Sequence, residues 1–142
     1  MVLTIVLATS FAAFARKEET LEQLIARAES ARLEDRPALY VEIAQRQVET
    51  ADQLYIAGKV DAARAAINDV VTYSDNARDA AISSGKKVKH TEIAMRKMAA
   101  KLRDVKRNLT FDDQAPVQAA VDHLEQVRTE LLAHMFGKKE DK

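Results

Sequence analysis

The placement of glycine and proline is the feature that most constrains the fold of this chain. Its 142 residues include three glycines and two prolines, and each is expected to fall between two helices. The intervals are rich in alanine, leucine, glutamate, lysine, arginine and glutamine, which all favour helices. No stretch alternates apolar and polar residues with the period of a strand. The sequence therefore predicts an all-α chain of long helices.

Capping residues and breakers set the expected bounds of the first two helices. A short helix is predicted near residues 20–32, with Thr20 and Gln23 in the positions of a capping box. A second helix is predicted to begin at Asp35, which would cap its first turn ahead of Pro37. Gly58 is expected to end this helix.

Three further helices follow from apolar residues that recur every three or four positions. One is predicted over residues 60–85, where Gly85 can take the left-handed conformation of a helix end. The next carries an apolar face over residues 95–109. Pro116 is predicted to open the last helix after a turn rich in capping acids, and a charged, frayed tail is predicted from Gly137.

Short connections make consecutive helices antiparallel, so residues 16–142 are expected to form one domain of helical hairpins, about four to five helices in all. Whether the hairpins form a bundle or a short solenoid stays open, because periodicity does not show where the apolar stripes converge. The absence of cysteine excludes thiol catalysis and thiolate metal sites. Twenty-two acidic and twenty-two basic residues cancel, so no global field selects a partner by charge.

The first fifteen residues are uncharged and predict a signal peptide. Their apolar stretch is shorter than the roughly 20 residues of a membrane-spanning helix, and Ala13 and Ala15 supply the small side chains of a cleavage site. A positively charged leading region is missing, and a buried first helix or an uncleaved anchor is the alternative. We expect export to the periplasm or the extracellular space, with residues 1–15 removed.

One segment resembles a known repeat family. Ala51, Leu54, Gly58 and Ala63 match the small, bulky, glycine and alanine positions at the centre of a tetratricopeptide repeat, and the resemblance covers about residues 47–75. No second copy occurs at the roughly 34-residue period of that family. The resemblance implies a helical hairpin in a scaffold that binds other proteins and has no enzymatic activity.

The strongest charge asymmetry lies in residues 86–107, which hold nine lysines and arginines against two acids. Four of the basic residues fall within about 40° of one another on a helix, opposite the apolar face. We call them the basic ridge: Lys89, Arg96, Arg103 and Arg107. The ridge is a candidate contact for an anionic surface or a partner protein, and a solvated helix face is the alternative.

No residue set in the sequence supports catalysis, a cofactor or a metal. His90, His123 and His134 lack the Glu-x-x-His spacing of bundle metal sites and are expected to lie apart, and no phosphate loop or nucleophile motif occurs. The basic segment lacks the interleaved aromatic residues that would indicate a nucleic-acid partner, and no small-molecule substrate is indicated. We therefore expect an exported, non-enzymatic scaffold or accessory domain that binds another protein. The alternative is a helix bundle that binds a lipid or polyanion through the basic ridge.

Overall fold

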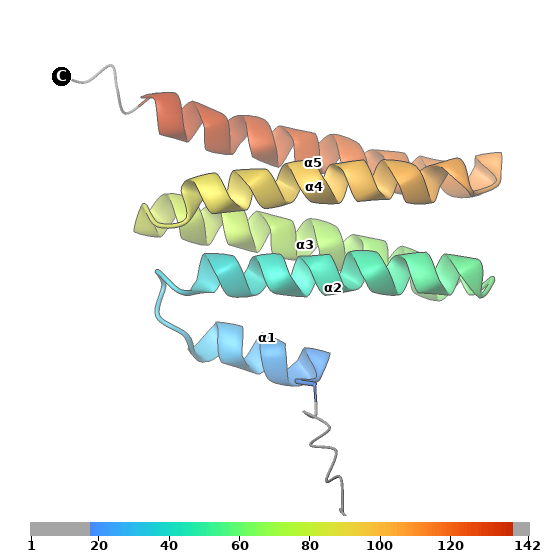
Figure 1. The fold of residues 1–142 in the computed structure, drawn as a ribbon, viewed down its shortest axis with the longest axis horizontal. Coiled ribbons are helices and arrows are strands. Elements are labelled where there is room, and N and C mark those ends of the chain that lie inside the picture. Colours follow the sequence, from blue (N-terminus) through green and yellow to red (C-terminus); the bar gives the residue numbers. More distant parts are fainter. Residues whose placement is uncertain (1–17, 138–142) are drawn as a thin grey trace, which may run out of the picture.

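The computed structural model describes residues 18–137, and this part of the chain is all-α, as predicted (Figure 1). Its five helices are joined by short connections: α1 (Leu21–Ser30), α2 (Arg36–Ile56), α3 (Val60–Ser84), α4 (Val88–Arg107) and α5 (Phe111–Gly137). The predicted signal peptide, residues 1–15, lies outside the described residues. None of the described helices is long and apolar enough to cross a membrane.

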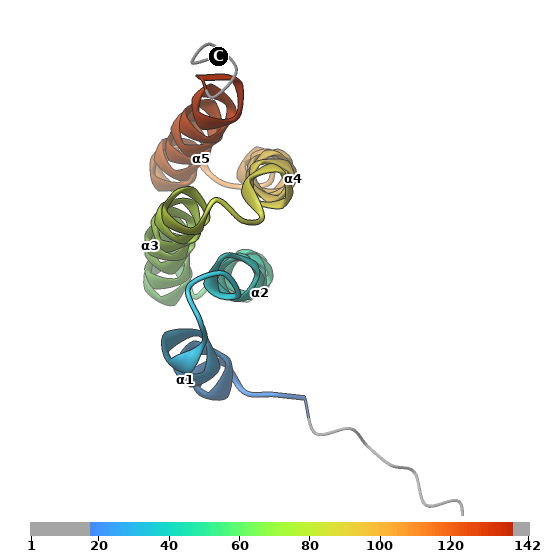
Figure 2. The same ribbon diagram turned by 90° about the vertical axis from the view of Figure 1, so that its left-hand side faces the viewer.

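The helices form two hairpins that stack on each other, as expected from the short connections. α2 packs most extensively against α3, and α4 against α5. Figure 2 shows α2 and α4 side by side in one layer and α3 and α5 in the other, with α1 against α2. Because α2 and α5 make no contact, the bundle does not close on itself, and each layer has a seam where the hairpins meet.

Several helix ends follow the predicted signals. The capping box is present: the Thr20 hydroxyl accepts a hydrogen bond from the Gln23 backbone N–H at 3.2 Å, and the Gln23 side chain accepts one from the Thr20 N–H at 3.0 Å. Gly58 and Gly85 have φ of 75° and 67°, a left-handed conformation that glycine adopts without steric cost. These glycines follow α2 and α3 and separate them from the next helices.

The predicted start of α2 is confirmed, because α2 begins at Arg36 with Asp35 at the N-cap position and Pro37 in its first turn, but the predicted side-chain cap is wrong. Asp35 already has helical backbone angles and belongs to a turn before α2, where its N–H donates to the Arg32 carbonyl at 2.9 Å. Its carboxylate lies 3.6 Å from Nε of Arg32 and makes no cap hydrogen bond to α2. Arg36 instead joins the two helices, because its guanidinium donates to the carbonyls of Ala31 and Glu29 at the end of α1.

The predicted start of α5 at Pro116 is also wrong, because α5 begins at Phe111 and contains Pro116. The Asp113 N–H donates to the Thr110 carbonyl at 3.0 Å, which closes a first turn ahead of the proline. Pro116 cannot donate to the carbonyl of Asp112 four residues earlier, and its ring crowds that carbonyl, but Asp112 is exposed, so water can hydrate the freed group. α5 also includes Gly137, where the tail was expected to begin, and residues 138–142 lie outside the described residues.

One continuous core joins both hairpins, with different side chains in each. The α2–α3 hairpin buries mainly small residues, such as Ala51, Ala63 and Ala77, which let the two helices approach closely. The α4–α5 hairpin buries larger ones, such as Met95 and Leu124. α1 adds a small separate cluster of Leu24, Ala28 and Ile43.

Candidate functional site

The seam between α2 and α4 is hollowed along its outer surface, and we call it the α2–α4 groove. One hollow of about 250 Å³ is lined by Gln45, Val48, Glu49, Lys97, Met98 and Lys101. A second hollow of about 220 Å³ is lined by Asp52, Tyr55, Ile56, Val105, Asn108 and Leu109. Together they run along the carboxyl-terminal halves of the two helices.

Helical spacing places both hollows on one line. The lining residues of each helix recur every three or four positions, which puts them on a single face of that helix. The Lys101 ammonium lies 3.5 Å from the Asp52 carboxylate, so one ion pair crosses the seam between the two hollows. The groove is therefore one continuous depression between α2 and α4, and the Lys101–Asp52 ion pair crosses it between the two hollows.

The groove has an apolar floor and a charged rim. Val48 and Met98 are 2% and 3% exposed and form the floor of the first hollow. Glu49 and Lys97 stand exposed on opposite walls, and neither has an ion-pair partner within residues 18–137. At the far end, Ile56 is 76% exposed beside the second hollow. A polar rim around an apolar patch is the pattern of protein–protein interfaces, and here Ile56 supplies the exposed apolar side chain because Val48 and Met98 are already buried within the chain.

The α3–α5 seam on the opposite layer is closed by ionic contacts. The Asp75 carboxylate lies within hydrogen-bond distance of His123 Nε2, at 2.7 Å. The same carboxylate lies 3.1 Å from the Arg78 guanidinium. Arg78 reaches Glu130 of α5 at 3.0 Å. Burial alone would lower the pKa of Arg78, but its hydrogen bond to Asp79 and the neighbouring carboxylates outweigh this and raise it. The cluster therefore holds a permanent positive charge among three acids.

Tyr55 connects the groove with the interior. Its ring lines the second hollow, while its hydroxyl is buried without a hydrogen-bond partner among the described residues. Burial raises the pKa of Tyr55; the charge of Arg64 opposes this rise and that of Asp113 adds to it. Arg64 and Asp113 form an ion pair at 3.5 Å between α3 and α5. The charges of the α3–α5 seam therefore influence the pKa of the Tyr55 hydroxyl.

The basic ridge lies on the flank of α4 that faces away from the groove. All four of its residues are exposed, as predicted for an outward face. Arg103 pairs with Glu125 of α5 at 2.9 Å, and Arg107 pairs with Asp104 at 2.8 Å. Lys89 and Arg96 have no ion-pair partner in the described part of the chain. The ridge therefore borders α5, whereas the cations that line the groove border α2.

The three histidines have different surroundings. His90 is exposed, His123 contacts Asp75, and the Nε2 atom of His134 is buried without a partner in the described region. Within residues 18–137, no three His, Cys, Asp or Glu side chains gather so that they could hold a metal ion. Sequence reasoning missed the contact of His123 with Asp75, since the two residues are 48 positions apart and meet only when the hairpins stack.

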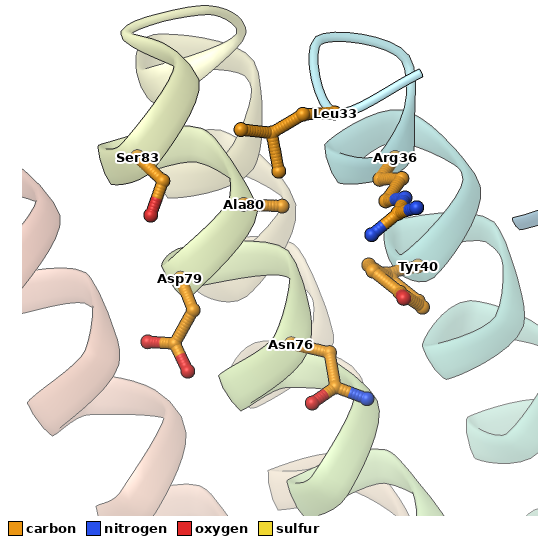
Figure 3. A pocket seen from close by; sticks show the side chains of 7 residues that line it. All are labelled: Leu33, Arg36, Tyr40, Asn76, Asp79, Ala80 and Ser83. Carbon is orange, nitrogen blue, oxygen red and sulfur yellow. The ribbon is translucent and has the colours of Figure 1, made fainter. Parts of the chain in front are cut away.

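A polar hollow of about 260 Å³ lies between the start of α2 and the end of α3, and Figure 3 shows its lining residues Leu33, Arg36, Tyr40, Asn76, Asp79, Ala80 and Ser83. Its volume falls below the roughly 300–1,000 Å³ of ordinary small-molecule sites. Its one cation, Arg36, already donates to the end of α1. A larger hollow of about 640 Å³ lies beside Glu18 and Glu19, where the described residues begin.

Sequence reasoning also missed the groove itself. Lys101 reads as an ordinary surface residue in the sequence, yet it bridges two helices, and neither Glu49 nor Lys97 stands out from its neighbours. Comparison of the chain with protein-family models, with curated proteins and with solved structures gives no match. The groove geometry therefore carries the functional argument.

Proposed function

We propose that this protein is an exported, non-enzymatic helical scaffold or accessory domain that binds another protein through the α2–α4 groove. The observation that carries the proposal is the groove, with its apolar floor at Val48 and Met98 and its charges at Glu49 and Lys97, which have no ion-pair partner among residues 18–137. Stable interfaces centre on such apolar, desolvated contacts within a polar rim. The resemblance of residues 47–75 to a tetratricopeptide unit supports the same class of function.

The dimensions of the groove fit a peptide segment better than a small molecule. Along α2 it extends from Gln45 to Ile56, which is about 16 Å at the helical rise of about 1.5 Å per residue. Its two hollows are each smaller than a typical small-molecule pocket, and a charged bridge separates them. A segment with several side chains can fill both hollows at once.

The non-enzymatic part of the proposal rests on the positions of the titratable groups. Among the described residues, the α3–α5 seam holds a connected set of titratable groups: Asp75, Arg78 and His123. Asp75 contacts both of the other two side chains, so these groups are already paired with one another. Catalytic groups need a pocket in which a substrate meets them. In the groove, the charged side chains instead stand on the rim, where they can select a partner by charge.

Site-specific crosslinking in the native host tests the binding function. A photoreactive amino acid replaces Gln45 or Asn108 in the groove, and Thr72, exposed on α3, serves as the matched control position. We expect the same partner protein to be captured from both groove positions and not from position 72. Capture from position 72 alone, or from none of the three positions, would contradict a binding role for the groove.

The export part of the proposal has its own measurement. Mass spectrometry of the protein isolated from its host should find Arg16 as the first residue, because the uncharged segment before it ends in Ala13-Phe14-Ala15. An intact Met1 would remove the case for a cleaved signal peptide. The binding proposal would still stand, since the groove lies entirely within residues 45–109.

The second candidate function is anion binding by the basic ridge, because Lys89 and Arg96 are exposed and lack ion-pair partners within the described ranges. Retention on heparin or anionic vesicles would then fall steeply with salt and be lost in a Lys89→Glu, Arg96→Glu double variant. Arg103 and Arg107 would contribute less, since Glu125 and Asp104 already neutralise them. Retention that the double variant leaves unchanged would exclude the ridge.

A further inference from the structure

We propose that the occupant of the α2–α4 groove is an amphipathic helix of the partner protein, with two apolar side chains seven residues apart, an acidic edge toward α4 and a basic edge toward α2. This inference rests on the proposed function and specifies its ligand. It is drawn from the repeat distance of the hollows, the chemistry of the floor and the charges on the two walls.

The two hollows are spaced two helical turns apart. Val48 and Tyr55 on α2, and Met98 and Val105 on α4, mark corresponding points in the two hollows, and each pair is seven residues apart. Seven residues correspond to two turns, or about 10 Å along the axis. A helix lying along the groove presents its residues i and i+7 at this same distance and on one face.

The floor favours a helix over an extended chain. α2 and α4 are continuous helices along the groove, so their backbone N–H and C=O groups are already hydrogen-bonded within them. An extended peptide would place its own backbone groups against Val48 and Met98 without hydrogen-bond partners, at a substantial free-energy cost. A helix satisfies its backbone internally and offers only side chains to the floor.

The walls define the charges of the occupant. Lys97 on the α4 wall and Glu49 on the α2 wall flank the first hollow, and neither is neutralised by another described residue. A carboxylate facing Lys97 and a cation facing Glu49 would complete both pairs. The second hollow is bordered by Ile56, which is 76% exposed, and by uncharged Asn108. The second apolar side chain of the occupant therefore gains additional contact with Ile56, while the charged residues flank the first.

The probe for the test is a phage-displayed library of helix-forming peptides about 16 residues long, in which only the positions on one face and its two edges are randomised. It is selected on the full chain. We expect enriched peptides to carry apolar residues at i and i+7, with acids on one edge and bases on the other. Lys97→Glu and Ile56→Lys should each weaken their binding at least tenfold, and unchanged circular dichroism would show that these exposed substitutions leave the fold intact.

Arg96→Glu is the matched control, because Arg96 precedes Lys97 but lies on the opposite flank of α4. It should change binding less than twofold, and replacing the acidic edge of the peptide by lysines should restore binding to Lys97→Glu. The proposal is overturned if no peptide is enriched, if the enriched peptides contain proline and bind as extended chains, or if Arg96→Glu weakens binding as much as Lys97→Glu. Self-association of the chain that Ile56→Lys abolishes would assign the groove to a second copy instead.

The two proposals fail in different ways. If photocrosslinking from Gln45 and Asn108 captures a partner while the helix library yields nothing, the binding function stands and the helical occupant is wrong. If neither experiment gives a signal, both proposals are wrong.

Discussion

The two seams between the stacked hairpins have the same topology but opposite character. In the α3–α5 seam, Asp75, Arg78, His123 and Glu130 form a connected cluster, and a further ion pair joins Arg64 to Asp113. In the α2–α4 seam, one ion pair between Lys101 and Asp52 separates two hollows. One seam is therefore filled by the chain itself, and the other is left with two hollows above a buried apolar floor.

The difference suggests a division of roles between the layers. Contacts within the α3–α5 seam hold the hairpins in register, so the α2–α4 seam does not have to be closed for the stack to persist. Rim charges such as Glu49 and Lys97, which have no ion-pair partner in the described part of the chain, contribute little to folding, because even exposed ion pairs are typically worth only about 0–1 kcal/mol. They are available to a partner at small cost to stability.

The largest expected difference compares one substitution in the two seams. Val127 of α5 is fully buried and shares a helix face with His123 and Glu130, whereas Val48 is equally buried but forms the groove floor. Val127→Ala should lower the free energy of unfolding by about 2–3 kcal/mol, because it leaves a closed cavity. Val48→Ala should cost about 1–2 kcal/mol, because the enlarged hollow can admit water. Urea unfolding measures both, and a larger cost at Val48 would contradict the open seam.

The ionic contacts allow a second comparison, with smaller expected effects. Arg78→Ala removes a cation whose side chain is 18% exposed and that has three acidic partners, so it should cost about 1–2 kcal/mol. Lys101→Ala removes a side chain that is 42% exposed and has one partner at 3.5 Å, so it should cost about 0–1 kcal/mol. Thermal melts at low and high salt give both values. Equal losses of stability in Arg78→Ala and Lys101→Ala would mean that ion pairs contribute equally to the two seams.

The smallest effect is expected at Tyr55, which lies between the seams. Its hydroxyl is buried without a hydrogen-bond partner among residues 18–137, so Tyr55→Phe should change stability by less than about 1 kcal/mol near neutral pH. Because burial raises the folded-state pKa of Tyr55, the unfolded chain ionises first as the pH rises above about 10, and stability is then lost. Tyr55→Phe should lessen this alkaline loss, and denaturant unfolding at pH 8 and pH 10.5 tests it. If the free energy of unfolding changes equally with pH in the parent and in Tyr55→Phe, the Tyr55 hydroxyl is solvated in the folded state and its pKa is not raised by burial.

Local signals in the sequence account for most helix boundaries. The capping box at Thr20 and the glycines at 58 and 85 act within a few residues, so their effects can be read without knowing the fold. Pro116 gave a wrong boundary and Asp35 a wrong side-chain cap, because the surroundings of each residue decided the outcome. The backbone N–H of Asp35 donates to the Arg32 carbonyl in the turn before α2, and its carboxylate makes no hydrogen bond to the helix. In α5, the exposed first turn lets water hydrate the carbonyl that Pro116 leaves without a donor.

The candidate site was less predictable than the helices. The ridge residues face solvent as expected, and Asp104 lies one helical turn from Arg107 in the sequence, but the sequence could not show that Glu125 of α5 would neutralise Arg103. Such pairings depend on which helix flanks meet and on how the helices are displaced along their axes. The groove residues carried no distinguishing motif, since charged and apolar residues alternate with the same spacing on many exposed helix faces.

The sequence by itself determined the all-α class, the antiparallel hairpins and the apolar face of each helix, because these follow from local propensity, short connections and a period of about 3.6 residues. Only the tertiary structure decided how the two hairpins stack. That stacking brings His123 to Asp75 over 48 positions and sets α2 beside α4 with a groove between them. The physical reason is that the apolar stripe of a helix requires burial but does not specify its neighbour. The neighbour is selected by the fit and charge of whole surfaces, to which residues far apart in the sequence contribute together.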